Sequence, residues 1–323
     1  MKATDVLVIG AGAAGLMCAI VAGNRGRRVV VLEGSNKVGK KILMSGGGRC
    51  NFTNLNFNPS YFLSRNPQFC ISALSRYTPR DFVSMVEKHG IPYHEKTAGQ
   101  LFCNNSSKDI VAMLLDECAA AGVDIRTHCE IESVSDNDGF VVATNIGEYR
   151  AASLVVASGG LSIPKMGATG IGYEFARQFG HAVIPTGAAL VPLTFTGALL
   201  EMMQRLSGVS LRATVSTVEQ SFGDDVLFTH RGMSGPAVLQ LSSYWSPGET
   251  VVVDLLPGHD LAAALLDAKR SRPRTLLRSV IAALLPRALV QELQDLLWPD
   301  VAEVALAEIS DEQLREIAGK LQH

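Results

Sequence analysis

The sequence of 323 residues is 47% hydrophobic and 19% charged, and its formal net charge at pH 7 is −2. This composition excludes a disordered or fibrous chain, and the length predicts about two globular domains. Because the densest basic run, residues 269–274, is short and isolated, we expect no nucleic-acid partner and no anionic-membrane partner.

The cysteines and the hydropathy pattern indicate where the protein works. Six cysteines form no Cys-x-x-Cys pair and no zinc-type spacing, which predicts reduced thiols and no metal site. No apolar run reaches the ~18 residues that cross a bilayer. We therefore expect a cytoplasmic protein without a membrane partner.

The first motif joins a strand to a helix. Val6–Ile9 form an apolar, β-branched run typical of a buried parallel strand. Gly10, Gly12 and Gly15 follow with the spacing G-x-G-x-x-G. In this motif the first glycine permits a tight turn, the second lets the backbone approach a pyrophosphate, and the third lets the helix pack closely on the strand. The N-terminus of the helix offers free N–H groups to the phosphates.

A second strand completes this fingerprint. Residues 28–32 read as a strand that ends at Glu33, 18 positions after Gly15, where a carboxylate accepts hydrogen bonds from an adenosine ribose. The order is a strand, the glycines, a helix, a second strand and an acidic residue. This order predicts a dinucleotide-binding Rossmann unit rather than a glycine-rich turn without a ligand.

Residues 34–54 show little helical or strand periodicity, which predicts a long, ordered and functional loop. Gly46, Gly47 and Gly48 leave three successive backbone N–H groups without flanking side chains, which suits close approach to a flat or anionic ligand. The positive and amide side chains of the loop are Lys40, Lys41, Arg49, Asn51 and Asn54.

The middle of the chain predicts helices and then a strand meander. Residues 60–90 have helical spacing, and we interpret His89 and His94 as solvated or packing side chains because neither has an acidic partner at useful spacing. Residues 107–121 predict a helix capped by Ser106 or Ser107. Strands are predicted at 123–127, 129–134 and 140–144.

A further apolar strand, Leu154–Ala157, leads into Ser158, Gly159 and Gly160. A buried strand that ends in such small residues lets the backbone pass close to a bound cofactor. A helix should then run from Thr169 to Gly180.

The second half begins with a change of composition at residues 185–192. Short strands are predicted at 191–195, 211–218, 226–228 and 251–255. Ser234 and Gly235 before Pro236 resemble a helix start. Helices are predicted at 261–266, 276–285 and 290–297, and Ser310 with Gln313 forms a capping box for the last helix.

The bound dinucleotide is predicted to be a flavin. There is a single fingerprint, it lies at the N-terminus, and a glycine-rich loop and a meander follow it instead of a continuing βαβ winding. A flavin carries redox chemistry itself, while the protein supplies orientation and electrostatics. The sequence has no Ser/His/Asp nucleophile-elbow motif and no His, Asp and Glu pattern of metal ligands that would favour another chemistry.

The sequence resembles the BaiN/YhiN-type flavoproteins, also described as aminoacetone-oxidase-family FAD enzymes. The shared motifs span nearly the whole chain: the 8–15 fingerprint, the 39–51 loop with Ser45-Gly-Gly-Gly-Arg-Cys-Asn51, Ala157–Gly160 with Pro164, Gly167–Gly170, Gly180 with His181, and residues 228–240. The resemblance implies an α/β fold: a glutathione-reductase-like FAD-binding Rossmann domain at 1–188, with an inserted small β-barrel at 189–258 and a helical subdomain at 259–323.

The same resemblance implies roles for individual residues. The backbone of Ile131 meets the adenine edge, and His230 and Arg231 lie at the substrate face. Cys50 has no second cysteine close in the sequence, so a packing or cofactor-contact role is favoured over a redox partnership with the flavin. The implied FAD-binding set is Gly10, Gly12, Ala13, Ala14, Gly15, Glu33, Lys41, Ser45, Gly46, Gly47, Gly48, Arg49, Cys50, Asn51, Ile131, Ala157, Ser158, Gly159 and Gly160.

Two features depart from the family pattern. Cys103 stands where the family usually has proline, and the sequence ends at His323 without the glycine-rich return that supplies the last strand of the family's FAD domain. We expect a truncated member or a fragment, with one strand missing from the sheet and apolar surface exposed.

The predicted function is that of an FAD-dependent oxidoreductase. A hydride would pass from transiently bound NAD(P)H through the flavin N5 to a small molecule with a conjugated carbonyl. The alternatives are a flavin amine oxidase, a catalytically impaired nucleotide-binding remnant, and a flavin-dependent RNA-modifying enzyme, the last disfavoured by the charge pattern.

Overall fold

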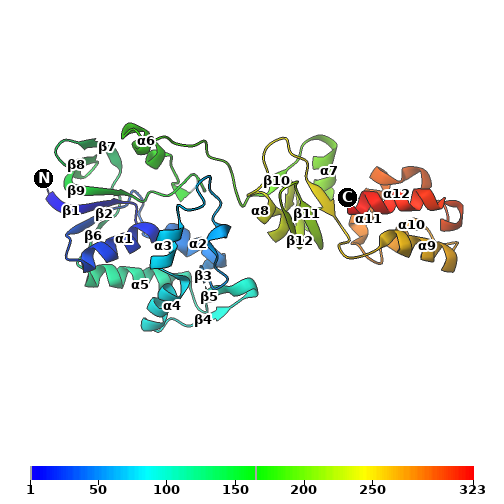
Figure 1. Cartoon of the computed structure of the whole chain (residues 1–323), viewed down its shortest axis with the longest axis horizontal. Coiled ribbons are helices and arrows are strands. Elements are labelled where there is room, and N and C mark those ends of the chain that lie inside the picture. Colours follow the sequence, from blue (N-terminus) through cyan, green and yellow to red (C-terminus); the bar gives the residue numbers. More distant parts are fainter. Residues whose placement is uncertain (1, 164–165) are drawn as a thin grey trace. The chain divides into compact units, whose positions relative to one another are not determined.

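The computed structural model describes residues 2–163 and 166–323, so Pro164 of the shared motifs lies outside the described residues. The chain divides into two compact units, Met1–Ile184 and Pro185–His323 (Figure 1). No helix among the described residues is long and apolar enough to cross a membrane.

The first unit is built on a six-stranded sheet with the order β6-β2-β1-β9-β8-β7. The first four strands in this order run parallel, whereas β8 and β7 are antiparallel additions at one side. The carboxyl ends of the parallel strands therefore meet at one edge, where a Rossmann fold binds its ligand. The strands are β1 (Lys2–Ile9), β2 (Val29–Leu32), β6 (Asp124–Arg126), β7 (Ile131–Asp136), β8 (Phe140–Thr144) and β9 (Gly147–Val156).

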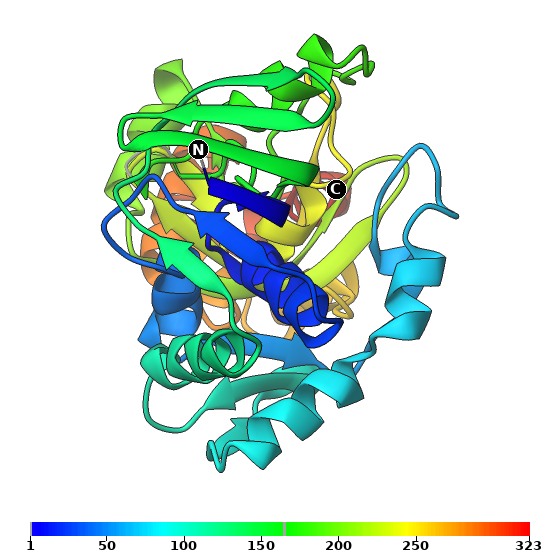
Figure 2. The ribbon, with the colours of Figure 1, turned by 90° about the vertical axis from the view of Figure 1, so that its left-hand side faces the viewer.

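Helices cover both faces of this sheet. On one face, α1 (Ala13–Asn24) and α5 (Ser107–Ala120) pack together against Val8 and Val31 (Figure 2). On the other face, α6 (Ile171–Gln178) closes a core that includes Leu7. Successive residues of β1 and β2 thus enter opposite cores, which explains why both strands are continuous apolar runs.

The predicted 34–54 loop is not irregular throughout. It contains α2 (Lys40–Met44), the 3₁₀ turn Ser45–Gly48 and β3 (Asn51–Asn54). β3 belongs to a separate three-stranded antiparallel sheet, β3-β5-β4, with β5 at Gln100–Cys103 and β4 at Tyr93–Glu95. These elements depend on distant partners, since β3 pairs with β5 and the Ser107 hydroxyl donates to the Leu43 carbonyl at 2.9 Å. Local periodicity therefore could not reveal them.

The predicted helical region 60–90 is helical only in part. It holds a 3₁₀ turn at Pro59–Tyr61, α3 (Ile71–Arg76) and α4 (Pro79–Lys88), and α4 starts with a capping box between Thr78 and Asp81. Of the residues between the 3₁₀ turn and α3, 67–70 form a turn and 62–66 are bends or irregular backbone.

The second unit combines an antiparallel sheet, β10-β13-β12-β11-β14, with six α-helices among its described residues. Strands and helices share one apolar core, and the Leu255 N–H donates to the Leu321 carbonyl of the last helix at 3.1 Å. The division at 189–258 and 259–323 remains a prediction. The elements are β10 (Leu193–Thr194), α7 (Gly197–Arg205), β11 (Ser210–Ser216), β12 (Ser221–Thr229), β13 (Gly232–Ser234), α8 (Pro236–Leu241), β14 (Val252–Asp254), α9 (Leu261–Ser271), α10 (Leu277–Ile281), α11 (Arg287–Leu297) and α12 (Asp311–Gln322).

Candidate functional site

The glycines after β1 have two different physical tasks. A Cβ on Gly15 would stand 1.9 Å from the Gly10 carbonyl oxygen, so only glycine lets α1 lie this close to the turn. Gly10 has φ +104°, and a Cβ there would stand 2.5 Å from the Ala157 carbonyl oxygen. A glycine at position 10 is therefore also needed for the chain that leaves β9 to pass this close to the turn. Around Gly12, by contrast, a Cβ would meet no atom within 4 Å. The open space thus lies at the glycine that is predicted to face the pyrophosphate.

The first turn of α1 is free to bind an anion. The helix begins at Ala13, no side chain caps its N-terminus, and its first turn contains no acidic residue. Ala13 and Ala14 are exposed there. Uncapped N–H groups and the positive end of the helix dipole stabilise a phosphate placed at such a terminus.

Glu33 is held in place by the backbone on both sides of it. One carboxylate oxygen accepts from the Ala11 N–H at 2.8 Å, and the other accepts from the Ser35 N–H at 2.9 Å. Each oxygen keeps a second lone pair for a ribose hydroxyl. Ala11 and Ser35 were missed by the sequence interpretation, although a serine two residues after the acid is a turn signal.

Ile131 begins β7 and pairs with Thr144 in β8. The segment before it runs past Glu33, because the Cys129 N–H donates to the Glu33 carbonyl at 3.0 Å. The contact of Ile131 with an adenine stays a prediction.

The second glycine cluster forms a left-handed turn. Gly46, Gly47 and Gly48 have φ values of +59°, +65° and +87°, and the Cys50 N–H closes the turn on the Ser45 carbonyl at 2.9 Å. Gly46 packs against Phe102, while Cβ atoms on Gly47 and Gly48 would meet nothing within 4 Å. Arg49 and Asn51 are exposed beside this open backbone.

The helix α2, which precedes the second glycine cluster, lies next to the segment that leaves β9. The Nζ atom of Lys41 lies 3.2 Å from the point where a Cβ on Gly159 would stand. At the neighbouring Gly160 a Cβ would stand 3.2 Å from the Tyr173 hydroxyl, and Ser158 touches the start of α6 through Gly172. The structure thus brings three sequence-predicted segments, 10–15, 41–51 and 157–160, to one region of the first unit.

Cys50 has a cysteine neighbour that its sequence context does not reveal. Cys103 lies on β5, its N–H donates to the Arg49 carbonyl at 3.0 Å, and both cysteine side chains are buried in one core. Burial raises the pKa of the Cys50 thiol. Burial and then the nearby Cys50 raise the pKa of Cys103 to about 11. Both thiols are therefore protonated at neutral pH and are poor nucleophiles.

A Cys50→Ala variant should consequently match wild type within about twofold, both in its content of the predicted flavin and in its catalytic rate. Removal of a small buried group costs about 1 kcal/mol of stability, which thermal unfolding measures. A loss of more than tenfold in the rate at unchanged flavin content would instead show that Cys50 takes part in the redox reaction. Cys118→Ala, a buried cysteine on α5, is the matched control.

His89 does have an acidic partner, contrary to the sequence interpretation. Its Nε2 atom lies 2.7 Å from a Glu117 carboxylate oxygen, and Lys88 reaches the same oxygen at 2.8 Å. Glu117 lies 28 residues further along the chain, on α5. His94 pairs with Asn104, in agreement with a packing role.

The contacts of Lys88 and His89 with the Glu117 carboxylate predict a pH dependence of stability. The hydrogen bonds from Lys88 and then His89 lower the pKa of Glu117 below its ordinary value of 4.5. The stabilisation is therefore complete above that value and is lost as the pH falls through the lowered pKa. Thermal unfolding should show the advantage of wild type over Glu117→Gln shrinking from about pH 5 downwards. An advantage that is constant between pH 6 and pH 3 would contradict this assignment.

His230 and Arg231 form the turn between β12 and β13 in the second unit, and both are exposed. The Thr229 hydroxyl donates to the Gly232 carbonyl at 3.1 Å, and the Arg231 carbonyl accepts from the Phe195 N–H at 3.1 Å. The backbone of the turn is thus fixed while both side chains stay available. Their substrate role stays a prediction.

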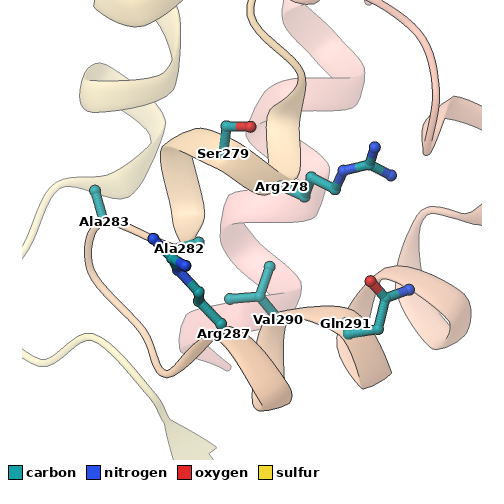
Figure 3. Close-up of a pocket in the computed structure, with 7 residues that line it drawn as sticks. All are labelled: Arg278, Ser279, Ala282, Ala283, Arg287, Val290 and Gln291. Carbon is teal, nitrogen blue, oxygen red and sulfur yellow. The ribbon is translucent and has the colours of Figure 1, made fainter.

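The second unit also has a hollow of about 450 Å³ between α10 and α11 (Figure 3). Arg278, Arg287 and Gln291 line it, and Arg278 is paired with Glu303. None of the sequence-predicted site residues lies there. Within the part of the chain that the structure describes, no cluster of three His, Cys, Asp or Glu side chains could hold a metal ion.

The parallel sheet edge, the open glycine backbone, the uncapped helix and the oriented acid define a Rossmann-type FAD-binding α/β protein. The chain belongs to the HI0933-like family, because the model of the HI0933-like protein Rossmann domain matches residues 4–316. Membership of the narrower BaiN/YhiN group remains a prediction.

Three relatives are similar to this chain over most of its length. A ribosomal RNA dihydrouridine synthase from Escherichia coli (strain K12) is 49% identical over 94% of this chain and 76% of its own. A protein of the same name from Haemophilus influenzae is 44% identical over 99% of this chain and 80% of its own. A 3-dehydro-bile acid delta(4,6)-reductase from Clostridium scindens is 29% identical over 77% of this chain and 64% of its own.

Proposed function

We propose that this protein reduces a carbon–carbon double bond conjugated to a carbonyl, with NAD(P)H as the reductant and a uracil base of ribosomal RNA as the acceptor. The observation that carries the proposal is the 49% identity to a protein named for dihydrouridine formation. The bile acid reductase supports the reaction type, because its name also describes double-bond reduction. In uracil, the bond between C5 and C6 is conjugated to the carbonyl at C4, so both substrates are enones.

The first unit supplies the cofactor site in this proposal. When bound, FAD supplies a hydride carrier at its N5 atom. The first turn of α1 and the open space at Gly12 would hold the pyrophosphate, and Glu33 the adenosine ribose. The backbone at Gly47 and Gly48, with Lys41 and the 157–160 segment, would line the flavin. NAD(P)H would bind only transiently, because the single glycine fingerprint belongs to FAD.

The overall reaction converts NAD(P)H, a proton and uridine into NAD(P)⁺ and dihydrouridine. The hydride adds to C6, the proton adds to C5, and negative charge develops on the C4 carbonyl oxygen in between. By the family resemblance we assign these two tasks to the turn between β12 and β13: the Arg231 guanidinium would stabilise such charge, and His230 would act as the proton donor. An acceptor in ribosomal RNA would also place the reaction in the cytoplasm.

The proposal departs from the predicted small-molecule acceptor and from the expectation that no nucleic acid is a partner, so its experiment compares both acceptors. Under anaerobic conditions the purified flavoprotein receives NADH or NADPH, and then either ribosomal RNA that lacks dihydrouridine or a small cyclic enone. We expect the nicotinamide to bleach the flavin, the RNA to restore its colour, and one uridine to gain the mass of two hydrogen atoms. Restoration by the enone with unchanged RNA would favour the small acceptor. Bleaching by an amine alone would identify an amine oxidase.

A further inference from the structure

One long segment of this chain has an unusual charge composition. Residues 34–80 contain seven Lys and Arg residues and no Asp or Glu, although the whole chain has 29 basic and 31 acidic residues. The net charge of the whole chain is −2, so it does not reveal that this segment of the first unit is positively charged. In residues 55–80, which we call the 55–80 arm, the three arginines Arg65, Arg76 and Arg80 are exposed, and none forms an ion pair with any described residue.

The 55–80 arm also exposes aromatic rings. Phe69 is 81% exposed, Tyr61 67%, Phe62 46% and Tyr77 40%, and every residue from 61 to 69 is exposed. Scattered surface aromatics are ordinary, but four within 17 positions of one acid-free segment are not. Figure 2 shows the arm standing away from the central sheet.

The arm is shaped by its own hydrogen bonds. The Leu55 N–H donates to the Gly99 carbonyl at 2.8 Å, which fixes the start of the arm beside β5. The Asn58 side chain accepts from the Ser60 N–H at 2.9 Å, and the Phe62 N–H donates to the Pro59 carbonyl at 3.1 Å. The rings are thus presented from an ordered backbone.

The arm follows the glycine cluster directly along the chain. Asn51, the last residue of the predicted flavin loop, is the first residue of β3, and the arm leaves the end of that strand. The four residues of β3 thus join the glycine turn to the arm within the first unit.

We propose that the 55–80 arm is a docking surface for single-stranded RNA, in which exposed rings stack on unpaired bases and arginines contact phosphates. This inference rests on the proposed function, and it identifies the surface that would present the target base. A uracil stacked within a duplex cannot present its C5–C6 bond to a flavin, so the enzyme must bind it unstacked. Rings combined with positive charge are the features that single-stranded nucleic acid requires. The absence of carboxylates from residues 34–80 favours a polyanion over an apolar protein partner.

The test uses the full chain with bound FAD and a fluorescently labelled single-stranded fragment of ribosomal RNA. The double variant Tyr61→Ala/Phe69→Ala should weaken RNA binding at least about tenfold at fixed salt, because each ring stacks on a base. Its matched control is Leu199→Ala/Val218→Ala, which removes two exposed apolar side chains from the second unit and should change the Kd less than about twofold. Flavin content and thermal unfolding confirm that each variant is folded.

The arginines have a separate readout. The triple variant Arg65→Gln/Arg76→Gln/Arg80→Gln should lower the slope of log Kd against log salt by about two, since each phosphate contact to a single strand contributes about 0.7. The control Arg25→Gln/Arg27→Gln/Arg212→Gln changes exposed arginines elsewhere and should leave the slope unchanged. Wild-type RNA affinity in both arm variants would overturn the docking surface.

Product analysis separates this proposal from the proposed function. Equal rates of dihydrouridine formation by wild type and the arm variants at one low RNA concentration would support the proposed reaction and contradict the docking surface. If RNA binding depends on the arm but no uridine is reduced, the docking surface is supported and the proposed reaction is contradicted.

Discussion

Gly15→Ala should destabilise the first unit by about 3 kcal/mol and abolish flavin retention, because the new methyl group overpacks a rigid contact. The added Cβ would stand 1.9 Å from the Gly10 carbonyl oxygen, which is backbone and cannot rotate away. α1 must then move off the turn, and its first N–H groups leave the position in which they meet the phosphates. Thermal unfolding and the visible absorption of the purified variant measure the two effects.

Gly12→Ala is the matched control for that prediction. Its φ of −82° suits alanine, and the new Cβ would meet no protein atom within 4 Å. The protein without FAD should therefore keep its stability, while FAD affinity should fall because the methyl group fills the space predicted for the pyrophosphate. Equal loss of stability in the two variants, or normal FAD affinity in Gly12→Ala, would contradict the division of tasks between these glycines.

Glu33→Ala should raise the Kd for FAD by about 10- to 100-fold, which corresponds to the loss of one or two hydrogen bonds to a charged group. The carboxylate holds the N–H groups of Ala11 and Ser35 at 2.8 and 2.9 Å, so its removal also loosens the backbone on both sides of the nucleotide. Glu33→Gln keeps the shape and one acceptor, and its effect should be intermediate. Titration of the protein without FAD by flavin fluorescence measures all three affinities.

Glu132→Ala serves as the control for Glu33, because it removes an exposed carboxylate from β7. It should bind FAD as wild type does. If Glu33→Ala also bound FAD normally, the adenosine end of the cofactor would not lie at the carboxyl end of β2.

The N-terminal fingerprint could be predicted from sequence because its information is local. The strand, the three glycines and Glu33 lie within residues 6–33, and the structure brings the turn after β1 together with Glu33 after β2. Caps at Ser106 and Ser310, and Gly235 before the proline that starts α8, were predicted for the same reason. Each such signal links residues within about one helical turn.

The features that sequence reasoning missed depend on contacts between distant residues. β3 is a strand only because β5 pairs with it, Cys50 meets Cys103 through that pairing, and Glu117 reaches His89 from another helix. The 55–80 arm was overlooked for a different reason. Its lack of Asp and Glu is visible in the sequence, but the net charge of the whole chain does not reveal where the charges lie.

The flavin content of the purified 323-residue chain tests the central claim most directly. The claim is that these residues build an FAD site. We predict the two visible absorption bands of oxidised flavin, about one FAD per chain, and their loss on anaerobic addition of NAD(P)H. A folded but colourless protein that binds ADP and cannot be reconstituted with FAD would contradict the account and favour a nucleotide-binding remnant.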